Sequence, residues 1–358
     1  AFTPCERLTD DDACMIVYTS GTTGYPKGAV LTHKNLYMNS MNAIAFSGWK
    51  PHNKQLVVPP LFHVAAMSTL ITTTLQDGTS VIHREFDPVK ILETIQAEKI
   101  NQIFLVPAMW NFLFQVPTWN QYDLSSLTSC STGGAVTPLE LKKRIMEAFP
   151  NAQLYEAFGQ TEMSPCTTML GHEHILRKTD SVGLPAPNVE VRIVDEEMND
   201  VPVGQVGEIV YRGPTVMKEY YKNPEATAEA FKGGWFHSGD LVRQDEEGFI
   251  YVVDRKKDMI ISGGENIYPK EIEEVLYTHP AILEAAVIGV PDETWGETVK
   301  AVVVVKSGHT LTAEGVIAHC TRHLASYKKP RIVEFVDALP RNAAGKVLKR
   351  VLREAHRS

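Results

Sequence analysis

The sequence lacks the features that would place the protein in a membrane, on nucleic acid or in a disulfide-bonded scaffold. Its 358 residues contain no apolar run long enough to cross a bilayer, which leaves only peripheral membrane contact open. Acidic residues outnumber basic ones, 43 to 35, and no basic stripe indicates a nucleic-acid partner. The five cysteines are scattered without a C-x-x-C pair, so a reducing cytoplasmic location is expected and a zinc site is not. Composition gives no indication of the oligomeric state.

What the chain does have, up to about residue 160, is an alternation of apolar strands and amphipathic helices. Met15–Tyr18 is predicted to be a buried strand, followed by a Gly/Thr-rich loop and a helix capped by Thr32. Pro88–Ala97 and Pro138–Phe149 are predicted helices. Such alternation is typical of α/β proteins, in which helices flank a parallel sheet.

The residue pattern of the sequence changes after about residue 180. Short β-rich runs separated by Gly, Pro and Asp continue to residue 255 and predict an antiparallel sheet or small barrel. A compact α+β pattern follows, and the polar run Asp254–Asp258 is interpreted as the boundary. We therefore expect a large domain at 1–256, which includes a β-rich subdomain at about 180–255, and a mobile C-terminal domain at 257–358.

The strongest local pattern is the segment Thr19-Ser20-Gly21-Thr22-Thr23-Gly24-Tyr25-Pro26-Lys27-Gly28, which follows the first predicted strand. Glycines let backbone N–H groups approach an anion, hydroxyls donate further hydrogen bonds, and lysine supplies charge. The composition indicates a polyphosphate ligand, although a flexible turn is the alternative. The Walker A pattern of kinases and GTPases is absent from this loop, which disfavours those classes.

This loop resembles the phosphate-binding signature of the adenylate-forming superfamily, which includes acyl-CoA synthetases, luciferases and peptide-synthetase adenylation domains. The resemblance covers essentially the whole chain and is closest to medium- and long-chain fatty acyl-CoA synthetases. Further motifs follow in the order of that family: Gly133-Gly134-Ala135, Phe158-Gly159-Gln160-Thr161-Glu162, Ser238-Gly239-Asp240, Asp254–Asp258, Gly263-Gly264-Glu265-Asn266, and Pro340-Arg341-Asn342 through Gly345-Lys346.

The resemblance implies an ATP site. The residues that it assigns to ATP are Thr19, Ser20, Gly21, Thr22, Thr23, Gly24, Lys27, Gly133, Gly134, Ala135, Glu156, Ala157, Phe158, Gly159, Asp240 and Arg255. Asp240 is expected to accept from the ribose hydroxyls. Phe158 stands where the family usually has tyrosine, so it keeps an aromatic face but lacks a hydroxyl. Taken singly, Asp240 could be an ordinary turn aspartate and Arg255 a surface ion-pair residue.

Three residues are implied to be catalytic. Glu162 follows a strand at the carboxyl end of the predicted sheet, where a carboxylate can hold Mg²⁺. Thr161 resembles the residue that donates to the α-phosphate. Lys346 could neutralise both the substrate carboxylate and the α-phosphate. Taken singly, Glu162 and Lys346 would be solvated surface residues.

Other positions bear on the substrate acid and the thiol. Amino-acid-activating relatives carry aspartate at the position of His63, so His63 argues against an α-amino acid and is expected to border the acyl pocket. A hydrogen-bonded structural histidine is the alternative. Gly263 and Gly264 are expected to line the passage for coenzyme A, and Lys257 matches the hinge of the family.

We therefore expect an acid–thiol ligase that uses ATP, Mg²⁺ and coenzyme A to convert a carboxylic acid, expected to be a medium- or long-chain fatty acid, into acyl-CoA through an acyl-adenylate. The alternatives are an aryl-acid CoA ligase, an acyl-AMP ligase that loads a carrier protein, and a non-catalytic nucleotide- or acyl-binding remnant. The non-catalytic remnant remains an alternative because family members carry well over a hundred residues before the phosphate loop. We thus expect part of one family subdomain to be absent from this chain.

Overall fold

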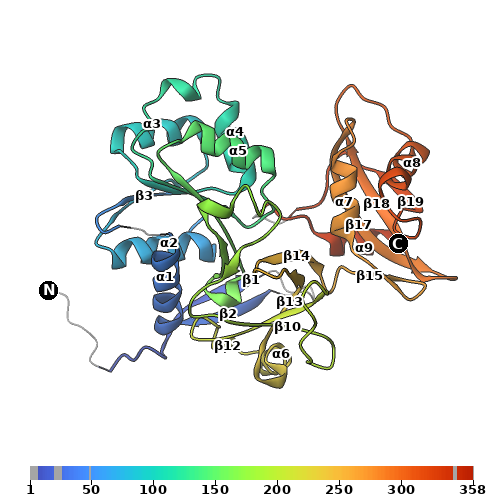
Figure 1. Ribbon diagram of the computed structural model, residues 1–358, viewed down its shortest axis with the longest axis horizontal. Helices are drawn as coiled ribbons and strands as arrows, with labels where there is room; N and C mark the ends of the chain where they lie inside the picture. Colours follow the sequence, from blue (N-terminus) through green and yellow to red (C-terminus); the bar gives the residue numbers. More distant parts are fainter. Residues whose placement is uncertain (1–6, 20–25, 48–49, 342–344, 358) are drawn as a thin grey trace. The chain divides into compact units, whose positions relative to one another are not determined.

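The structure is a computed structural model that describes residues 7–19, 26–47, 50–341 and 345–357. The chain forms two compact units (Figure 1). Unit 1 comprises Ala1–Ser238 and Arg243–Tyr251, and unit 2 comprises Gly239–Val242 and Val252–Ser358. The expected α/β class is confirmed. No helix in the described part of the chain is long and apolar enough to cross a membrane.

The main sheet of unit 1 has seven strands in the order β4-β3-β5-β6-β7-β8-β9. The first five are parallel, and β8 and β9 extend the sheet in antiparallel fashion. Their bounds are β3 (Lys54–Val57), β4 (Thr79–Ile82), β5 (Gln102–Phe104), β6 (Ser129–Gly133), β7 (Gln153–Gly159), β8 (Cys166–Leu170) and β9 (Leu184–Pro185).

Helices cover both faces of this sheet. One layer contains α3 (Pro88–Glu98), α4 (Pro107–Gln115) and α5 (Leu139–Ala148), whose apolar faces enclose the largest core around Trp110. The other layer contains α1 (His33–Ser47) and α2 (Val64–Leu75), which pack against each other (Figure 1). The predicted cap of α1 is confirmed, because Thr32 Oγ1 accepts from the N–H of Asn35 at 3.2 Å. Short 3₁₀ turns occur at η1 (Trp119–Gln121), η2 (Thr161–Met163), η3 (His172–His174) and η4 (Lys232–Gly234).

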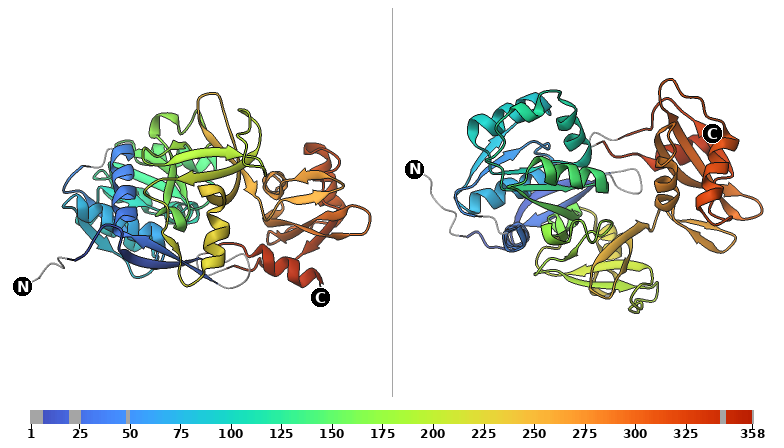
Figure 2. Two further views of the ribbon diagram at one scale, coloured as in Figure 1. Left: turned by 90° about the horizontal axis from the view of Figure 1, so that it is seen from below. Right: turned by 45° about the horizontal axis from the view of Figure 1, so that its top comes forward.

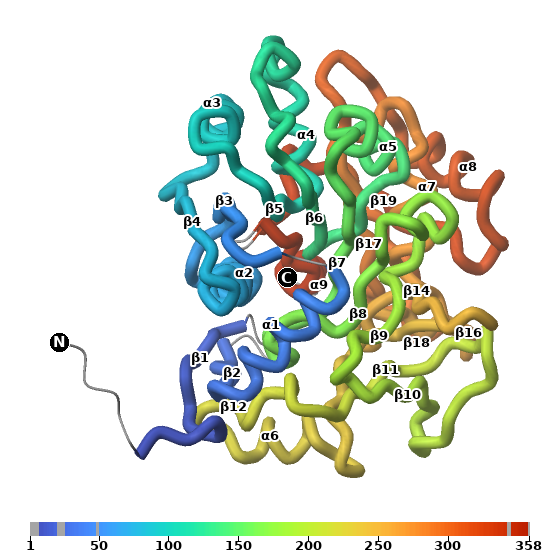
Figure 3. The backbone as a smooth tube through the Cα atoms, turned by 60° about the vertical axis from the view of Figure 1, so that its left-hand side comes forward, coloured from blue at the N-terminus to red at the C-terminus, as the bar shows by residue number. Residues whose placement is uncertain are grey.

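The first strand differs from its prediction. β1 (Ala13–Thr19) pairs in antiparallel fashion with β2 (Lys27–Thr32), which itself pairs with β12 (Glu219–Tyr220), so these strands form a separate three-stranded sheet (Figure 3). The Gly/Thr-rich loop thus connects two strands instead of leading directly into a helix. β1 is also not buried, since Ile16 and Tyr18 are exposed. It lies at the edge of its sheet, whereas β2 pairs on both sides and is buried.

The β-rich region forms the antiparallel sheet that was one of the two predictions for it. Its strands β10 (Glu190–Val194), β11 (Gly207–Arg212), β13 (Phe236–Gln244) and β14 (Ile250–Arg255) lie in that order. The short helix α6 (Pro224–Ala230) precedes β13 and is capped by Asn223. β13 and β14 contribute residues to both units.

Unit 2 is built on a sheet whose long hairpin is β17 (Ile282–Asp292) and β18 (Gly296–Val305), with β15 (Ile260–Ser262), β16 (Glu265–Ile267) and the parallel strand β19 (Ile332–Phe335). Alternate residues of the hairpin face opposite sides. One side packs on α7 (Pro269–Tyr277) and α8 (Ala313–His323), and the other packs on α9 (Lys349–Arg357) (Figure 2, orange to red). Each face of this sheet therefore has its own apolar core.

Candidate active site

The carboxyl ends of β6 and β7 carry two motifs side by side. Gly133 pairs with Ala157 across these parallel strands, and a Cβ at Gly133 would collide with the carbonyl oxygen of Ala157. A Cβ at Gly159 would likewise collide with the carbonyl of Pro165. Only glycine allows these backbone approaches. The structure thus places Gly133, which begins the predicted Gly133–Ala135 motif, beside Ala157, which directly precedes Phe158 and Gly159.

Glu156, which the resemblance assigns to ATP, is engaged inside the protein. Its Oε2 lies 2.6 Å from Nζ of Lys142, a lysine that is only 1% exposed, and its Oε1 accepts from the N–H of Thr137. Lys142 also donates to the carbonyl of Thr179 at 2.6 Å. This ion pair fastens α5 to β7, and removing one partner would leave an uncompensated buried charge. Lys142 was not identified from the sequence, where it reads as an ordinary helix lysine.

Glu162 lies in the 3₁₀ turn η2, immediately after β7, and is 9% exposed. Its Oε1 accepts from the hydroxyl of Tyr220 at 2.8 Å, and its carbonyl accepts from the N–H of Met217 at 2.7 Å. Burial and the adjacent carboxylate raise the pKa of Tyr220, which keeps this hydroxyl protonated as a donor. Thr161 is half-buried in the same turn. Tyr220 was missed by the sequence reasoning.

Lys27 approaches the same cluster from β2. Its ammonium lies over the ring of Tyr220, 5.0 Å from the ring centre, and its carbonyl accepts from Thr19 Oγ1 at 3.4 Å. Thr19 and Lys27 therefore lie near the two ends of the phosphate-loop motif, on paired strands. The predicted ligands Ser20, Gly21, Thr22, Thr23 and Gly24 lie outside the described residues.

The Glu162 carboxylate and its surroundings suit a magnesium ion that binds together with a polyphosphate. No cluster of three or more His, Cys, Asp or Glu side chains suited to a metal occurs in the described part of the chain. No hydrogen bond to the second carboxylate oxygen, Oε2 of Glu162, is described either. Mg²⁺ is commonly held by one or two carboxylates together with substrate phosphates and waters, rather than by an all-protein cage. A single buried glutamate near a lysine and a phosphate-loop motif matches that requirement.

A second group of predicted residues gathers in unit 2. Arg255 Nε lies 2.6 Å from Oδ1 of Asp240, which is 2% exposed, so these two side chains pair across β13 and β14. Lys346 interacts electrostatically with both members of this pair. Desolvation, together with the positive charges of Arg255 and Lys257, lowers the pKa of Lys346. The structure therefore brings Asp240, Arg255, Lys257 and Lys346 together.

Arg341 supports the segment that carries Lys346. Its guanidinium lies 2.6 Å from Oε1 of Glu284 on β17 and donates to the carbonyl of Gly345 at 2.6 Å. Arg341 also forms a β-bridge with Val347. These contacts fix the residues on both sides of Lys346 to the sheet of unit 2.

The residues expected to serve the thiol step also lie in unit 2. Lys257 occupies a turn closed by the N–H groups of Asp258 and Met259, which both donate to the carbonyl of Arg255. Gly263 and Gly264 form the β15–β16 turn with positive φ of 60° and 85°. A Cβ at Gly263 would meet the ring of Trp295 at 2.6 Å.

His63 precedes α2 and is exposed. Its Nδ1 accepts from the N–H of Ala65 at 3.2 Å and caps the helix. Although the residue is exposed overall, partial desolvation of its ring lowers the pKa of His63, which agrees with a neutral ring whose Nδ1 accepts a hydrogen bond. This hydrogen bond matches the structural alternative for His63, and its role at an acyl pocket stays a prediction.

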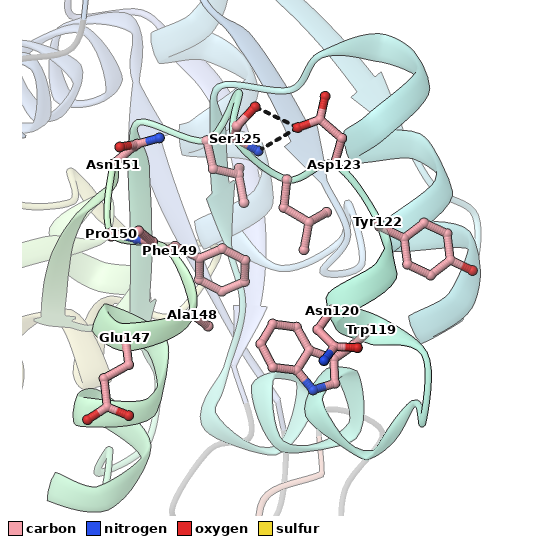
Figure 4. Close-up of a pocket in the computed structure, with 12 residues that line it drawn as sticks. Trp119, Asn120, Tyr122, Asp123, Ser125, Glu147, Ala148, Phe149, Pro150 and Asn151 are labelled. Atoms are coloured by element: carbon pink, nitrogen blue, oxygen red, sulfur yellow. Dashed lines mark hydrogen bonds between the residues drawn. The ribbon is translucent and has the colours of Figure 1, made fainter.

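A described cavity of about 390 Å³ lies elsewhere, at the amino ends of β6 and β7 (Figure 4). Trp119 and Tyr122 stand on one side of it, and Glu147 to Asn151 form the other. Asp123 at its rim is already engaged by Ser125 and Lys99. The predicted nucleotide motifs follow the opposite, carboxyl ends of the same strands, as expected for open α/β sheets.

Similarity to known proteins defines the class. The AMP-binding enzyme family matches residues 2–221, and the C-terminal domain of AMP-binding enzymes matches residues 271–346. Feruloyl-CoA synthase from an Amycolatopsis species is 44% identical over 95% of this chain and 69% of its own length. Long-chain-fatty-acid–CoA ligase FadD13 from Mycobacterium tuberculosis is 38% identical over 99% of this chain and 69% of its own length. ATP-bound MatB from Rhodopseudomonas palustris superposes with a TM-score of 0.91 at 35% identity, covering 100% of this chain and 71% of that protein.

Strand order, motif positions and these similarities agree on an enzyme with the adenylate-forming fold. The chain belongs to the AMP-binding enzyme family and is an acyl-CoA ligase of that family. Both relatives are longer than this chain, which spans 69% of each of them.

Proposed function

We propose that this protein joins a carboxylic acid to coenzyme A in two steps at the expense of ATP. In the first step a carboxylate oxygen attacks the α-phosphorus, a new P–O bond forms, and pyrophosphate leaves. In the second step the thiolate of coenzyme A attacks the acyl carbon, a C–S bond forms, the bond from that carbon to the phosphate oxygen breaks, and AMP leaves. The buried Glu162, held by Tyr220 beside Lys27 and the phosphate-loop motif, is the observation that carries this proposal.

In the first step, different residues bind the phosphates, bind the ribose and stabilise the developing charge. Lys27 and the phosphate-loop motif bind polyphosphate, and Thr161 donates to the α-phosphate. Asp240 binds the ribose, and Arg255 orients Asp240. Lys346 stabilises the negative charge that develops between the carboxylate and the α-phosphate. Mg²⁺, when bound at Glu162, supplies charge neutralisation to the phosphate oxygens.

The second step uses another part of unit 2. Gly263 and Gly264 present a turn without side chains, which suits the narrow pantetheine arm of coenzyme A. Lys346 and this glycine turn belong to the same unit, so we propose that unit 2 reorients about Lys257 between the steps. The expected domain limits, 1–256 and 257–358, belong to this proposal.

For the acid, we propose a substrate without an α-ammonium group, because the chain has His63 where amino-acid-activating relatives carry aspartate. A fatty acid is the first candidate, and similarity to FadD13 supports it. An aryl acid is the second candidate, and it is supported by feruloyl-CoA synthase, whose identity to this chain is higher, 44% against 38% for FadD13.

ATP–pyrophosphate exchange tests the proposal directly. The purified protein is assayed with octanoate, palmitate, ferulate, phenylalanine and no acid, and CoA-dependent thioester formation is measured in parallel. We expect exchange and acyl-CoA with a fatty or an aryl acid. Exchange with phenylalanine alone would exclude the proposed substrate class. Exchange without acyl-CoA would indicate a carrier-protein acceptor, and no exchange with any acid would indicate the non-catalytic alternative.

A further inference from the structure

Tyr220 connects two parts of the polyphosphate site that no sequence motif joins. It lies on β12, is 8% exposed, and is 58 residues away from its hydrogen-bond partner Glu162. Its hydroxyl donates to Glu162 Oε1 at 2.8 Å, while the face of its ring supports the ammonium of Lys27 at 5.0 Å. One side chain thus contacts the predicted cation ligand and the predicted phosphate ligand.

The backbone around Tyr220 is fixed on both sides. Residues 214–221, here called the bridging segment, form two hydrogen bonds to β2. The N–H of Lys218 donates to the carbonyl of Val30 at 2.9 Å, and the N–H of Tyr221 donates to the carbonyl of Gly28 at 2.7 Å. The same segment bonds to the Glu162 turn through Met217 N–H to Glu162 O. Asn35 on α1 donates to the carbonyls of Pro214 and Val216. Because these bonds hold the backbone of Tyr220, its hydroxyl has a defined position relative to Glu162.

We infer that Tyr220 is a positioning residue that holds the Glu162 carboxylate for a divalent cation and the Lys27 ammonium for the polyphosphate. The hydrogen bond from the hydroxyl to Oε1 fixes the orientation of the Glu162 carboxylate, which would hold the cation. The ring holds Lys27 by a cation–π contact, and the N–H groups that point away from the ring stay available to phosphate oxygens. The inference rests on the proposed ATP-dependent function and adds to it a residue outside the recognised motifs.

Two substitutions separate the roles of the hydroxyl and the ring. Tyr220→Phe removes the hydrogen bond to Glu162 and keeps the ring beneath Lys27, whereas Tyr220→Leu removes both. Tyr211→Phe is the matched control, because Tyr211 is also a buried tyrosine of unit 1, and its hydroxyl contacts Thr167 instead.

The first measurement is Mn²⁺ binding to protein saturated with a non-hydrolysable ATP analogue, followed by the electron paramagnetic resonance signal of free Mn²⁺. Loss of a hydrogen-bond partner of a metal ligand typically weakens metal affinity roughly 10–100-fold, and we expect a loss in this range for Tyr220→Phe. Binding of the analogue in the presence of EDTA should stay unchanged in Tyr220→Phe and weaken in Tyr220→Leu. Tyr211→Phe should match the wild type in both measurements.

A merely structural role for the hydroxyl would give another pattern. Tyr220→Phe would then lower the melting temperature while its Mn²⁺ affinity equalled that of the wild type, and that result overturns the inference. If the Phe and Leu variants bind the ATP analogue equally well in the presence of EDTA, the role of the ring is overturned. If Tyr220→Leu does not fold, the Phe variant alone decides the role of the hydroxyl, and Lys27→Met then tests the phosphate contact in its place. Absence of pyrophosphate exchange in the wild type would overturn the proposed function, while the Mn²⁺ titration would still test Tyr220.

Discussion

Arg255 Nε lies 2.6 Å from Oδ1 of Asp240, and this ion pair joins the Ser-Gly-Asp motif to the polar run that begins at Asp254. Asp240 is almost fully buried, whereas about a third of the Arg255 side chain is exposed. The arginine therefore supplies the charge that allows the Asp240 carboxylate to remain buried at the proposed ribose site.

Asp240→Ala should raise the KM for ATP, because the ribose hydroxyls lose their acceptor. A hydrogen bond to a charged group contributes about 1.5–3 kcal/mol, so we expect an effect of about tenfold or more. Steady-state kinetics at saturating acid measure the change. Arg255→Gln is the comparison and should give a smaller rise, since it only loosens Asp240. An unchanged KM in folded Asp240→Ala would remove this residue from the site.

Lys346→Ala should slow adenylation by roughly 10²–10³, because one preorganised charge donor is lost. Formation of acyl-CoA from pre-made acyl-AMP should be spared, since the α-phosphate is not attacked in that step. Single-turnover assays of each half-reaction measure the two rates. Lys306→Ala, at an exposed lysine of the same unit, should leave both unchanged. Equal losses in the two half-reactions would make Lys346 a structural residue.

Arg341→Met should affect the same half-reaction as Lys346→Ala, but less strongly. The substitution removes the bonds to Glu284 and to the carbonyl of Gly345, so the segment beside Lys346 loses its attachment to β17. Glu284→Gln should show a milder form of the defect because the neutral amide still accepts. The ratio of acyl-AMP formation to thioester formation is the measurement. A fall in thioester formation alone would contradict this assignment.

Lys257→Pro should separate the half-reactions in the opposite sense. Proline removes no described hydrogen bond at this position, but it fixes φ and restricts Lys256, so the turn loses its ability to reorient. We expect acyl-AMP to form and accumulate while acyl-CoA formation falls. Lys257→Ala keeps the backbone free and should not separate the two half-reactions, although it removes a positive charge near Lys346. If the two rates fall together, or neither falls, rotation about Lys257 is not part of the mechanism.

Unit 2 should lose stability in mild acid through His279. Desolvation, followed by the charges of His319, Arg322 and Lys306, lowers the pKa of His279. A histidine with a depressed folded-state pKa adds stability above its unfolded pKa of about 6.5, and that stability is lost as the pH falls through the folded value. Protonation of Nδ1 would also break its hydrogen bond from the N–H of Ala281.

Amide hydrogen exchange in α7 and α8 at about pH 7.5 and about pH 5.5 measures this loss. His279→Asn retains an acceptor but does not titrate, so its change in protection should be smaller than in the wild type. His309→Asn, at an exposed position, serves as the control. Identical pH dependence in His279→Asn and the wild type would exclude His279 as the cause.

Local signals in the sequence predicted much of the fold correctly, and contacts between distant segments account for what was missed. The Thr32 cap depends on a residue three positions away, so it is visible in the sequence. The exposure of Ile16 and Tyr18 depends on which strands neighbour β1, and apolar residue type gives no indication of that. Tyr220 and Lys142 look like ordinary strand and helix residues until the fold places them beside Glu162 and Glu156.

The interleaving of the two units limits how the gene can be divided. The chain passes from unit 1 to unit 2 after Ser238, returns after Val242, and passes again after Tyr251. A single cut therefore cannot release unit 2 whole: a fragment that starts at Val252 lacks Asp240, and a fragment that starts at Gly239 retains Arg243–Tyr251 of unit 1. Split-protein reporters or separately expressed halves would need the β13–β14 hairpin kept intact on one side, so that Arg255 keeps its acidic partner.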